Sequence, residues 1–315
     1  MFKNMLKRLL QLLFIALVVL VAWLYTPDTS WEKMRDKYAT AESEFVTLEN
    51  GLRLHYRDTG NSAGKAIVLI HGTSDSLLTW DRISPLLQND YRLIAMDLPG
   101  HGLSSQHPER DYSKQGFSNS VQLLMDHLGI DSATLVGNSL GGNIAWRTAA
   151  LAPGKVDALV LLDPSGSPPV VNKKSNIGFR LMRTSIGRQL GKIFTPRTLI
   201  EKSLIGTVYD PLLVNDALTD RYWEMLRLPG NRDTLTALAL VQWDQQAWEN
   251  IGQIATPSLI IWGAEDHITP TKNAAVFNSA MSNSQLLIYP EVGHLPMIEV
   301  PEKTAADIRS FLEEL

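Results

Sequence analysis

The stretch 133–151 constrains the fold of this chain more than any other part of the sequence. It begins with an apolar run, 133–136, that is typical of a buried strand, and from residue 140 onward its apolar spacing is typical of a helix. The turn between them reads glycine–x–serine–x–glycine, with the serine at position 139. A serine on so sharp a turn lies in strained backbone, and its neighbours must be small for the chain to reverse. We therefore predict that Ser139 is a nucleophile presented at a strand end.

Two backbone N–H groups are predicted to face the negative charge that develops when such a serine attacks a carbonyl group. The helix after Ser139 directs its N-terminus, and the free N–H of Leu140, at this charge. A second donor is needed, and the strand-like run 67–70 ends in His71, Gly72 and Thr73. We assign the second N–H to Thr73, and one such donor typically stabilises the transition state by ~3 kcal/mol.

A serine nucleophile needs a base that takes its proton and a carboxylate that orients the base. Asp266 follows the strand-like run 258–262, and His294 follows the next such run, 285–289. Both positions lie just past the carboxyl ends of predicted strands, where open α/β sheets hold their reactive groups. We predict Asp266 as the acid and His294 as the base, because serine, aspartate and histidine then follow a known triad order. Asp163, after an earlier strand-like run, is the alternative acid.

Two further groups of polar residues receive structural rather than chemical interpretations. Asp97 and His101 lie close together in Asp-Leu-Pro-Gly-His-Gly, but this run is typical of a rigid turn that requires glycine and proline. His55 lies on an alternating run beside Asn50-Gly51, a pair that is a strong hairpin signal. Its side chain is predicted to lie at the surface.

The composition excludes several classes of protein. The chain has 315 residues, of which 44% are apolar, so it can bury one sizeable core and an insertion. A formal net charge of −4 gives no sign of nucleic-acid binding. Because the chain has no cysteine, structural disulfides and thiolate metal sites are excluded. We expect neither a metal nor an organic cofactor.

The N-terminal segment 1–25 is predicted to be a single-pass membrane anchor. Lys3, Lys7 and Arg8 precede an apolar run of 17 residues, 9–25, which is close to the ~20 residues of a membrane-spanning helix. The run is longer than the apolar region of a typical secretory signal, and no small-x-small cleavage site follows it. A cleaved signal peptide is the alternative. The basic residues favour an N-terminus inside the cell and a catalytic domain on the extracytoplasmic side.

The rest of the chain divides into a linker, a core and an insertion. Residues 26–44 are polar and charged and are predicted to form the linker. Apolar strand-like runs alternate with helical patterns over 45–164 and 252–315, which indicates an α/β core with a mostly parallel sheet and helices on both faces. Between them, 165–251 has helix-like patches separated by proline and glycine, and it is predicted to form a helical cap over the serine.

Part of the predicted cap is strongly basic. Between residues 173 and 202 there are eight Lys or Arg residues and one acidic residue, and apolar residues between them fall mostly on one helical face. One interpretation is a cap that binds an anionic membrane surface and draws lipid substrate from it. The other is an ordinary lid helix with its apolar face on the core and its basic face in solvent.

Together, the motifs resemble those of the α/β-hydrolase fold family. The resemblance runs from about residue 45 to 315 and rests on the stretches HGTSDS, MDLPGHGLSS, GNSLGG, LVLLDPSG, LIIWGAEDHI and EVGHLPMIEVPE. They are similar to the bacterial lipase and esterase group that includes the cold-adapted lipases, bacterial lipase family five. The resemblance implies Ser139, Asp266 and His294 as nucleophile, acid and base, and a carboxylic ester as substrate.

The same motifs also resemble carbon–carbon bond hydrolases of aromatic-ring breakdown and monoacylglycerol lipases. Dehalogenases and soluble epoxide hydrolases of this fold carry aspartate at the nucleophile position, so Ser139 argues against both. The predicted function is hydrolysis of a small-molecule or lipid ester through an acyl-enzyme. A carbon–carbon hydrolase with the same triad and a catalytically silent binding protein of this fold are the alternatives.

Overall fold

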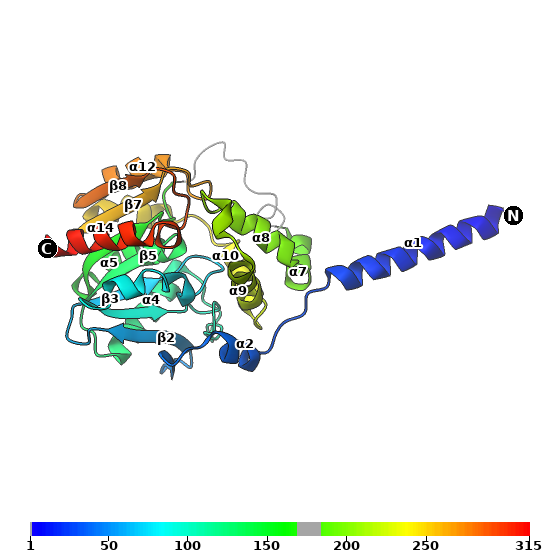
Figure 1. Ribbon diagram of the computed structural model, residues 1–315, viewed down its shortest axis with the longest axis horizontal. Helices are drawn as coiled ribbons and strands as arrows, with labels where there is room; N and C mark the ends of the chain where they lie inside the picture. The colour runs from blue at the N-terminus through cyan, green and yellow to red at the C-terminus, as the bar shows by residue number, and fades with distance from the viewer. Residues whose placement is uncertain (1, 169–183) are drawn as a thin grey trace.

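An eight-stranded sheet between layers of helices forms the centre of the molecule in the computed structural model, which describes residues 2–168 and 184–315 (Figure 1). The strand order is β1-β2-β4-β3-β5-β6-β7-β8; β2 runs antiparallel to both its neighbours, and the later pairs are parallel. The predicted α/β class with a mostly parallel sheet is therefore confirmed. The strands are β1 (Ser43–Thr47), β2 (Arg53–Gly60), β3 (Ala66–Ile70), β4 (Arg92–Met96), β5 (Ala133–Asn138), β6 (Val156–Leu162), β7 (Ser258–Gly263) and β8 (Ser284–Tyr289).

Hydrophobic clusters fill both sides of this sheet, as expected where parallel strands are covered on both faces. Trp146 and Phe277 belong to one cluster, whereas Ile308 and Phe311 belong to the other. Strand β5 is buried at every position, which explains why its sequence carries no charged residue and does not alternate between apolar and polar side chains. The covering helices are α3 (Ser84–Leu87), α4 (Lys114–His127), α5 (Leu140–Leu151), α12 (Lys272–Ala280), α13 (Pro296–Glu299) and α14 (Pro301–Glu313), with the short 3₁₀ helices η1 (Leu77–Trp80), η2 (Pro153–Lys155) and η4 (Ile251–Gln253).

The first two strands form the predicted hairpin. Strand β1 pairs antiparallel with β2, and Gly51 in the turn has a φ of 80°, which glycine adopts without strain. The N–H of Gly51 donates to the carbonyl of Leu48 at 2.8 Å and closes the turn. This pair adds an antiparallel edge to the parallel sheet.

His55 on β2 is buried, so the prediction of a surface side chain was wrong. Only 1% of its surface is exposed, and its Nδ1 lies 2.6 Å from Asp97 Oδ2. Burial would raise the pKa of Asp97, but the facing His55 ring keeps that pKa below its usual value. The backbone N–H groups of Leu77 and Leu103 also donate to this carboxylate, each at 2.7 Å. Asp97 thus ties three segments together, which agrees with the structural role expected for its loop.

A group of helices inserted between β6 and β7 forms a cap beside the sheet (Figure 1). Four of the eight residues of the basic stretch, at positions 173, 174, 180 and 183, lie outside the described residues. The cap elements are α7 (Ser185–Ile193), α8 (Arg197–Ile205), η3 (Pro211–Leu213), α9 (Asp216–Leu226), α10 (Asn231–Leu238) and α11 (Gln245–Glu249).

Helix α1 (Phe2–Leu24) projects away from the folded body (Figure 1). Its segment Asn4–Ala22 is long and apolar enough to cross a membrane, and the 19 residues correspond to ~28 Å at 1.5 Å per residue. None of this segment is buried inside the protein. A signal sequence near an N-terminus has the same length and composition, so the helix alone does not distinguish an anchor from a signal.

The predicted linker 26–44 is packed against the cap. The hydroxyl of Thr26 donates to a backbone carbonyl of α7 at 2.9 Å. Helix α2 (Trp31–Tyr38) follows, and the hydroxyl of Tyr38 donates to Glu224 of α9 at 2.5 Å. A soluble form of the protein should therefore begin no later than Thr26, because a later start would remove these contacts.

Candidate active site

Ser139 occupies the turn between β5 and α5 in strained backbone. Its φ of 54° and ψ of −110° lie outside the regions that residues other than glycine normally adopt. The flanking glycines are required by close packing. A Cβ on Gly137 would lie 2.3 Å from the backbone of Gly141, and a Cβ on Gly141 would lie 2.0 Å from the carbonyl oxygen of Ile70. The two glycines thus allow helix α5 to pack closely against the ends of β5 and β3, and Ser139 lies at the tip of the turn.

The structure brings Asp266 and His294 together. Nδ1 of His294 lies 2.7 Å from Oδ2 of Asp266 and is hydrogen-bonded to it, and both side chains are buried. A ring that donates from Nδ1 carries its lone pair on Nε2, which is the arrangement a general base needs. Burial by itself would raise the pKa of Asp266, but the His294 ring and hydrogen bonds from Thr269 hold that pKa below its usual value. Asp266 is therefore ionised at neutral pH.

Thr269 is a partner of this pair that the sequence reasoning missed. Its hydroxyl donates to Oδ2 of Asp266 at 2.5 Å, and its backbone N–H donates to Oδ1 at 3.0 Å. The N–H of Ile268 adds a third bond to Oδ1 at 2.6 Å. Because both carboxylate oxygens are held, the oxygen that faces His294 has a fixed position.

The alternative acid, Asp163, lies beside the same pair. Polar atoms of Asp163, Asp266 and His294 all lie within 4.8 Å of one another. Asp163 is fully buried, with a φ of 45°, and its Oδ1 accepts the backbone N–H of Gly263 at 2.9 Å. Burial, and then the charge of Asp266, raise the pKa of Asp163 well above its usual value. Burial and the charge of Asp266 thus favour the protonated form of Asp163, and Asp266 makes the direct contact with the histidine.

Two polar side chains, buried Asn138 and half-buried Glu299, hold the base loop in place. Asn138, next to the serine, donates from Nδ2 to the carbonyl of His294 at 3.0 Å and so links the nucleophile turn to the base loop. Glu299 accepts the backbone N–H groups of Gly293 and Leu295, each at 3.1 Å. Since these bonds fix the backbone on both sides of His294, they set the position of its ring.

The predicted oxyanion donors lie at neighbouring strand ends. A Cβ on Gly72 would lie 3.3 Å from the Cβ of Ser139, which places the turn after β3 against the serine. His71 shapes this turn, because its Nε2 accepts the N–H of Leu98 at 3.0 Å and its Nδ1 then donates to the carbonyl of Gly72 at 2.7 Å. Among the residues that the structure describes, the N–H groups of Thr73 and Leu140 have no hydrogen-bond acceptor.

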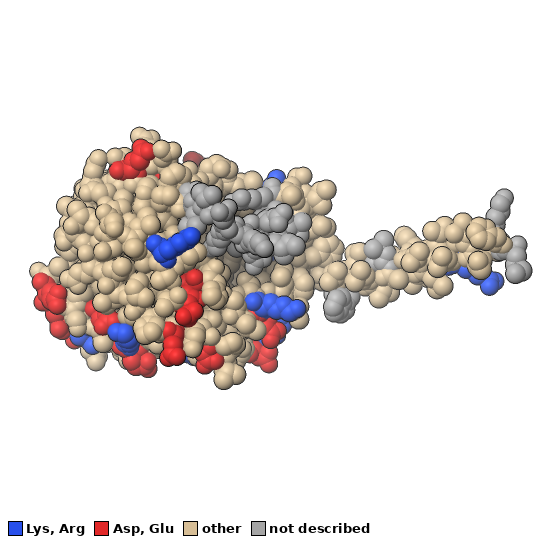
Figure 2. All heavy atoms as spheres, turned by 90° about the horizontal axis from the view of Figure 1, so that it is seen from above, with Lys and Arg blue, Asp and Glu red and all other residues tan. Residues whose placement is uncertain are grey.

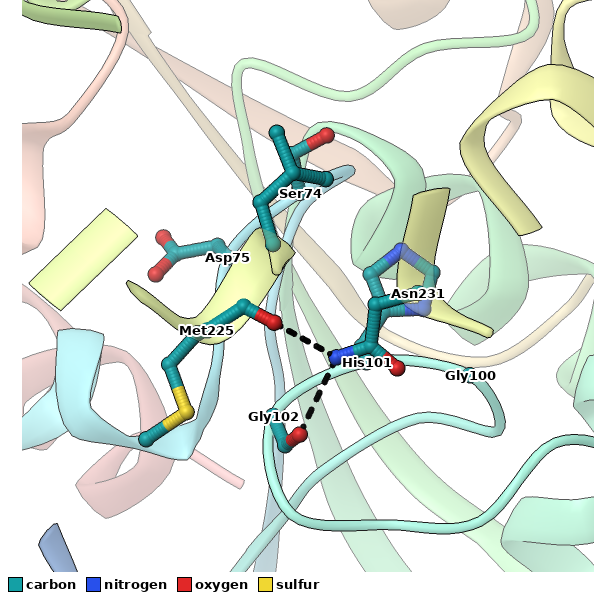
Figure 3. Close-up of a pocket in the computed structure, with 8 residues that line it drawn as sticks. Ser74, Asp75, Gly100, His101, Gly102, Met225 and Asn231 are labelled. Atoms are coloured by element: carbon teal, nitrogen blue, oxygen red, sulfur yellow. Dashed lines mark hydrogen bonds between the residues drawn. The ribbon is translucent and has the colours of Figure 1, made fainter. Parts of the chain in front are cut away.

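Cap and core meet at a small cavity beside this turn. Figure 3 shows Ser74, Asp75 and His101 from the core loops facing Met225 and Asn231 from the cap. The cavity holds about 10 Å³, which is room for roughly one water molecule. Next to it, the hydroxyl of Tyr222 in α9 donates to Asp75 at 2.6 Å. The cap is thus attached to the segment that carries the predicted oxyanion donor.

His101 at this cavity predicts a pH-dependent stability. Burial, and then the neighbouring His71, lower the pKa of His101 from 6.5 to about 3. The unfolded chain binds a proton below pH 6.5 whereas the folded protein does not, so stability is lost as the pH falls from 6.5 towards 3. The loss should be on the order of 4 kcal/mol at the acid end of that window.

Urea unfolding of the wild type and of His101→Gln between pH 7 and pH 4 measures this effect, because glutamine has no proton to gain. We expect the free energy of unfolding of His101→Gln to fall less than that of the wild type over this range. Parallel pH profiles for the two proteins would show that His101 does not control the acid sensitivity.

The sequence-predicted residues therefore lie at one edge of the sheet. Ser139, Asp266 and His294 follow the carboxyl ends of β5, β7 and β8, and the Thr73 turn follows β3. Their catalytic roles remain predictions. Asn138, Thr269 and Glu299 were missed. The partner of Asn138 follows another strand, and the partners of Thr269 and Glu299, although only three to six residues away, are reached only through the bends of their loops.

The sequence of this chain matches one known protein family. The family described as "alpha/beta hydrolase fold" matches residues 65–301, which is most of the chain. A 2-hydroxy-6-oxo-6-phenylhexa-2,4-dienoate hydrolase of Burkholderia cepacia is 27% identical over 275 residues, which cover 83% of this chain and 93% of that protein.

Two solved structures are similar over most of the fold. A meta-cleavage product hydrolase from Pseudomonas fluorescens IP01 has a TM-score of 0.73 at 25% identity and covers 86% of this chain and 97% of its own. A membrane phospholipase A, described as a bacterial virulence factor, has a TM-score of 0.74 at 25% identity and covers 99% of this chain and 98% of its own. At 99% coverage, the second similarity includes nearly all of α1.

Proposed function

Because the chain belongs to the α/β-hydrolase fold family, we propose that it hydrolyses carboxylic esters with Ser139 as nucleophile, His294 as base and Asp266 as acid. One observation carries this proposal. A strained serine on a strand–helix turn lies at the same sheet edge as a histidine whose Nδ1 is bound to an ionised carboxylate. The motif resemblance to bacterial lipase family five supports an ester as the substrate.

The mechanism follows from these positions. Ser139 Oγ attacks the ester carbonyl while Nε2 of His294 takes its proton, and Asp266 holds the ring in the tautomer that this transfer needs. The N–H groups of Thr73 and Leu140 stabilise the oxyanion. The alcohol then leaves with the proton from His294, and an acyl-enzyme remains on the serine. His294 next deprotonates a water molecule, which attacks the acyl carbonyl and releases the carboxylic acid.

In this proposal, α1 is an uncleaved anchor that holds the enzyme on a membrane. Its length and apolar composition support this role, as does the similarity to a membrane phospholipase A that includes nearly all of α1. Figure 2 shows α1 as a separate rod with basic side chains near its far end, where Lys7 and Arg8 lie. Basic residues at that end favour an N-terminus inside the cell and a catalytic domain on the extracytoplasmic side.

A lipid ester is the substrate class that fits this location. The similarity to a membrane phospholipase A and the anchor both favour a substrate that resides in the membrane. No nucleic-acid partner is proposed, because the chain is acidic overall. Carbon–carbon bond hydrolysis is a second candidate with a specific observation in its favour. The relative of 27% identity is named a 2-hydroxy-6-oxo-6-phenylhexa-2,4-dienoate hydrolase, and the similar structure of 25% identity is described as a meta-cleavage product hydrolase.

Hydrolysis of p-nitrophenyl esters from acetate to palmitate by the full chain in detergent tests the proposal. The same enzyme should be offered 2-hydroxy-6-oxo-6-phenylhexa-2,4-dienoate, the substrate named for the Burkholderia cepacia relative. We expect turnover of the esters and none of the dienoate, with the preferred acyl chain separating an esterase from a lipase. Turnover of the dienoate alone would replace ester hydrolysis with carbon–carbon hydrolysis.

A further inference from the structure

Helix α7 of the cap presents its apolar side chains outward. Ile186, Leu190 and Ile193 are three or four residues apart and share one face of the helix. Their exposed fractions are 71%, 42% and 41%. On another side of the helix, Gly187 is buried. A lid helix on a soluble protein turns its apolar face to the core, so α7 has the opposite orientation.

The polar side of α7 is attached to the body of the cap. Lys192 forms an ion pair with Asp233 of α10 at 2.6 Å, and both side chains are only partly exposed. The helix contains no acidic residue, so no charge on it repels an anionic lipid surface. An exposed apolar face with a paired basic residue behind it is typical of a helix that lies in a membrane interface.

The end of α7 lies next to the end of the membrane-spanning candidate. Helix α1 ends at Leu24, and two residues later the N–H of Thr26 donates to the carbonyl of Ile193 at 2.9 Å. The hydroxyl of Thr26 accepts the N–H of Thr195 at 2.6 Å. Two extended residues span at most ~7 Å, so the C-terminal end of α7 lies close to the point where α1 leaves the folded body. Figure 1 shows α7 beside this point.

This junction is held by the cap on a second side. Arg232 of α10 donates to the carbonyl of Thr26 at 2.8 Å and pairs with Asp28 at 2.5 Å. The N–H of Thr29 donates to the carbonyl of Arg227 at 2.9 Å. Because these bonds fix residues 26–29 to the cap, the end of α7 stays close to the end of α1.

We infer that α7 is an interfacial helix whose face of Ile186, Leu190 and Ile193 rests in the surface of the phospholipid bilayer that α1 crosses. A phospholipid bilayer is the partner that this geometry favours, because α1 ends only two residues before Thr26, which is bonded to the last residue of α7. If α1 crosses the bilayer, the membrane surface lies where α1 ends, beside α7. The cap is then docked on the membrane, which would bring lipid ester to the enzyme. This inference rests on the proposed anchor and does not depend on the proposed chemistry.

Site-directed fluorescence on the full chain tests the inference. Since the chain has no cysteine, Leu190→Cys introduces a single thiol that takes an environment-sensitive fluorophore. Val276→Cys on α12 is the matched control, because Val276 is exposed to 41% and Leu190 to 42%. Phe14→Cys in α1 reports the anchor. The labelled proteins are reconstituted into phosphatidylethanolamine–phosphatidylglycerol vesicles that carry a nitroxide at either shallow or deep positions of the lipid.

We expect the label at position 190 to shift its emission to the blue and to lose fluorescence to the shallow nitroxide, while the label at 276 does neither. Ile186→Cys, at the most exposed position of this face, should behave as Leu190→Cys does. Equal signals at 190 and 276, with position 14 quenched by the deep nitroxide, would overturn the docking of α7. No quenching at position 14 would contradict the anchor and the docking together. Neither readout needs ester turnover, so failure of the proposed chemistry stays distinguishable.

Discussion

Replacement of Ser139 by alanine is expected to lower kcat for ester hydrolysis by about 10⁶-fold, the size of effect that loss of the nucleophile has in a serine protease. The hydroxyl oxygen forms the covalent acyl-enzyme, and alanine offers no atom that can replace it. Alanine fits the same backbone turn, so the fold should be retained. Initial rates with a p-nitrophenyl ester measure the loss, and thermal unfolding checks the fold.

Ser120→Ala is the matched control for this experiment. Ser120 is a buried serine on α4, and its hydroxyl donates to a backbone carbonyl of its own helix. Ser120→Ala also removes a serine hydroxyl oxygen, but one that does not contact the predicted site, so this variant should keep its activity. Comparable turnover by Ser139→Ala and the wild type would exclude Ser139 as the nucleophile.

Replacement of Asp266 by asparagine is expected to lower kcat by about 10⁴-fold. An amide donates a hydrogen bond where the carboxylate accepts one, so it favours the tautomer of His294 that keeps a proton on Nε2 and cannot act as a base. Because Asp266 lies 2.7 Å from Nδ1 of His294, its carboxylate is the one whose charge holds the histidine in the tautomer that acts as a base. Steady-state kinetics on a soluble ester measure the effect.

Asp163→Asn separates the two candidate acids. The pKa of Asp163 is raised well above its usual value by burial and by Asp266, which favours the neutral form of this side chain. Asparagine is neutral and of similar shape, so kcat should change only by a small factor. If Asp163→Asn caused the large loss and Asp266→Asn the small one, the acid would be Asp163.

The strand ends of this fold could be predicted from the sequence because buried parallel strands leave continuous apolar runs. Such runs end at positions that are visible in the sequence, and Ser139, Asp266 and His294 follow three of them. Parallel strands place their carboxyl ends at one edge of a sheet, so these side chains were expected near one another. The Asp266–His294 hydrogen bond agrees with that expectation.

The side chains that position this pair could not be predicted. Thr269 is three residues from Asp266, but only the bend of the loop after β7 turns its hydroxyl onto the carboxylate. Asn138 reaches the carbonyl of His294 across 156 positions of sequence. The raised pKa of Asp163 likewise depends on its burial and on its distance to Asp266, which no local pattern contains.

The contacts that polar segments make inside the protein also could not be predicted from the sequence. Residues 26–44 have the composition of a solvated linker, yet Thr26 and Tyr38 bind backbone and side-chain groups of the cap. His55 lies on an alternating strand and was assigned to solvent, and the hydrogen bond with Asp97 satisfies its ring inside the protein. Polar composition indicates exposure only when no partner is available from a distant part of the chain.

The central claim is that Ser139 forms an acyl-enzyme with an ester. Rapid mixing of the full chain with p-nitrophenyl butyrate, acid quenching and peptide mass spectrometry tests it most directly. We predict a burst of nitrophenol and a butyryl group on the peptide that contains Ser139, with both signals absent from Ser139→Ala. A butyryl group on another residue, or steady ester turnover by Ser139→Ala, would contradict this account.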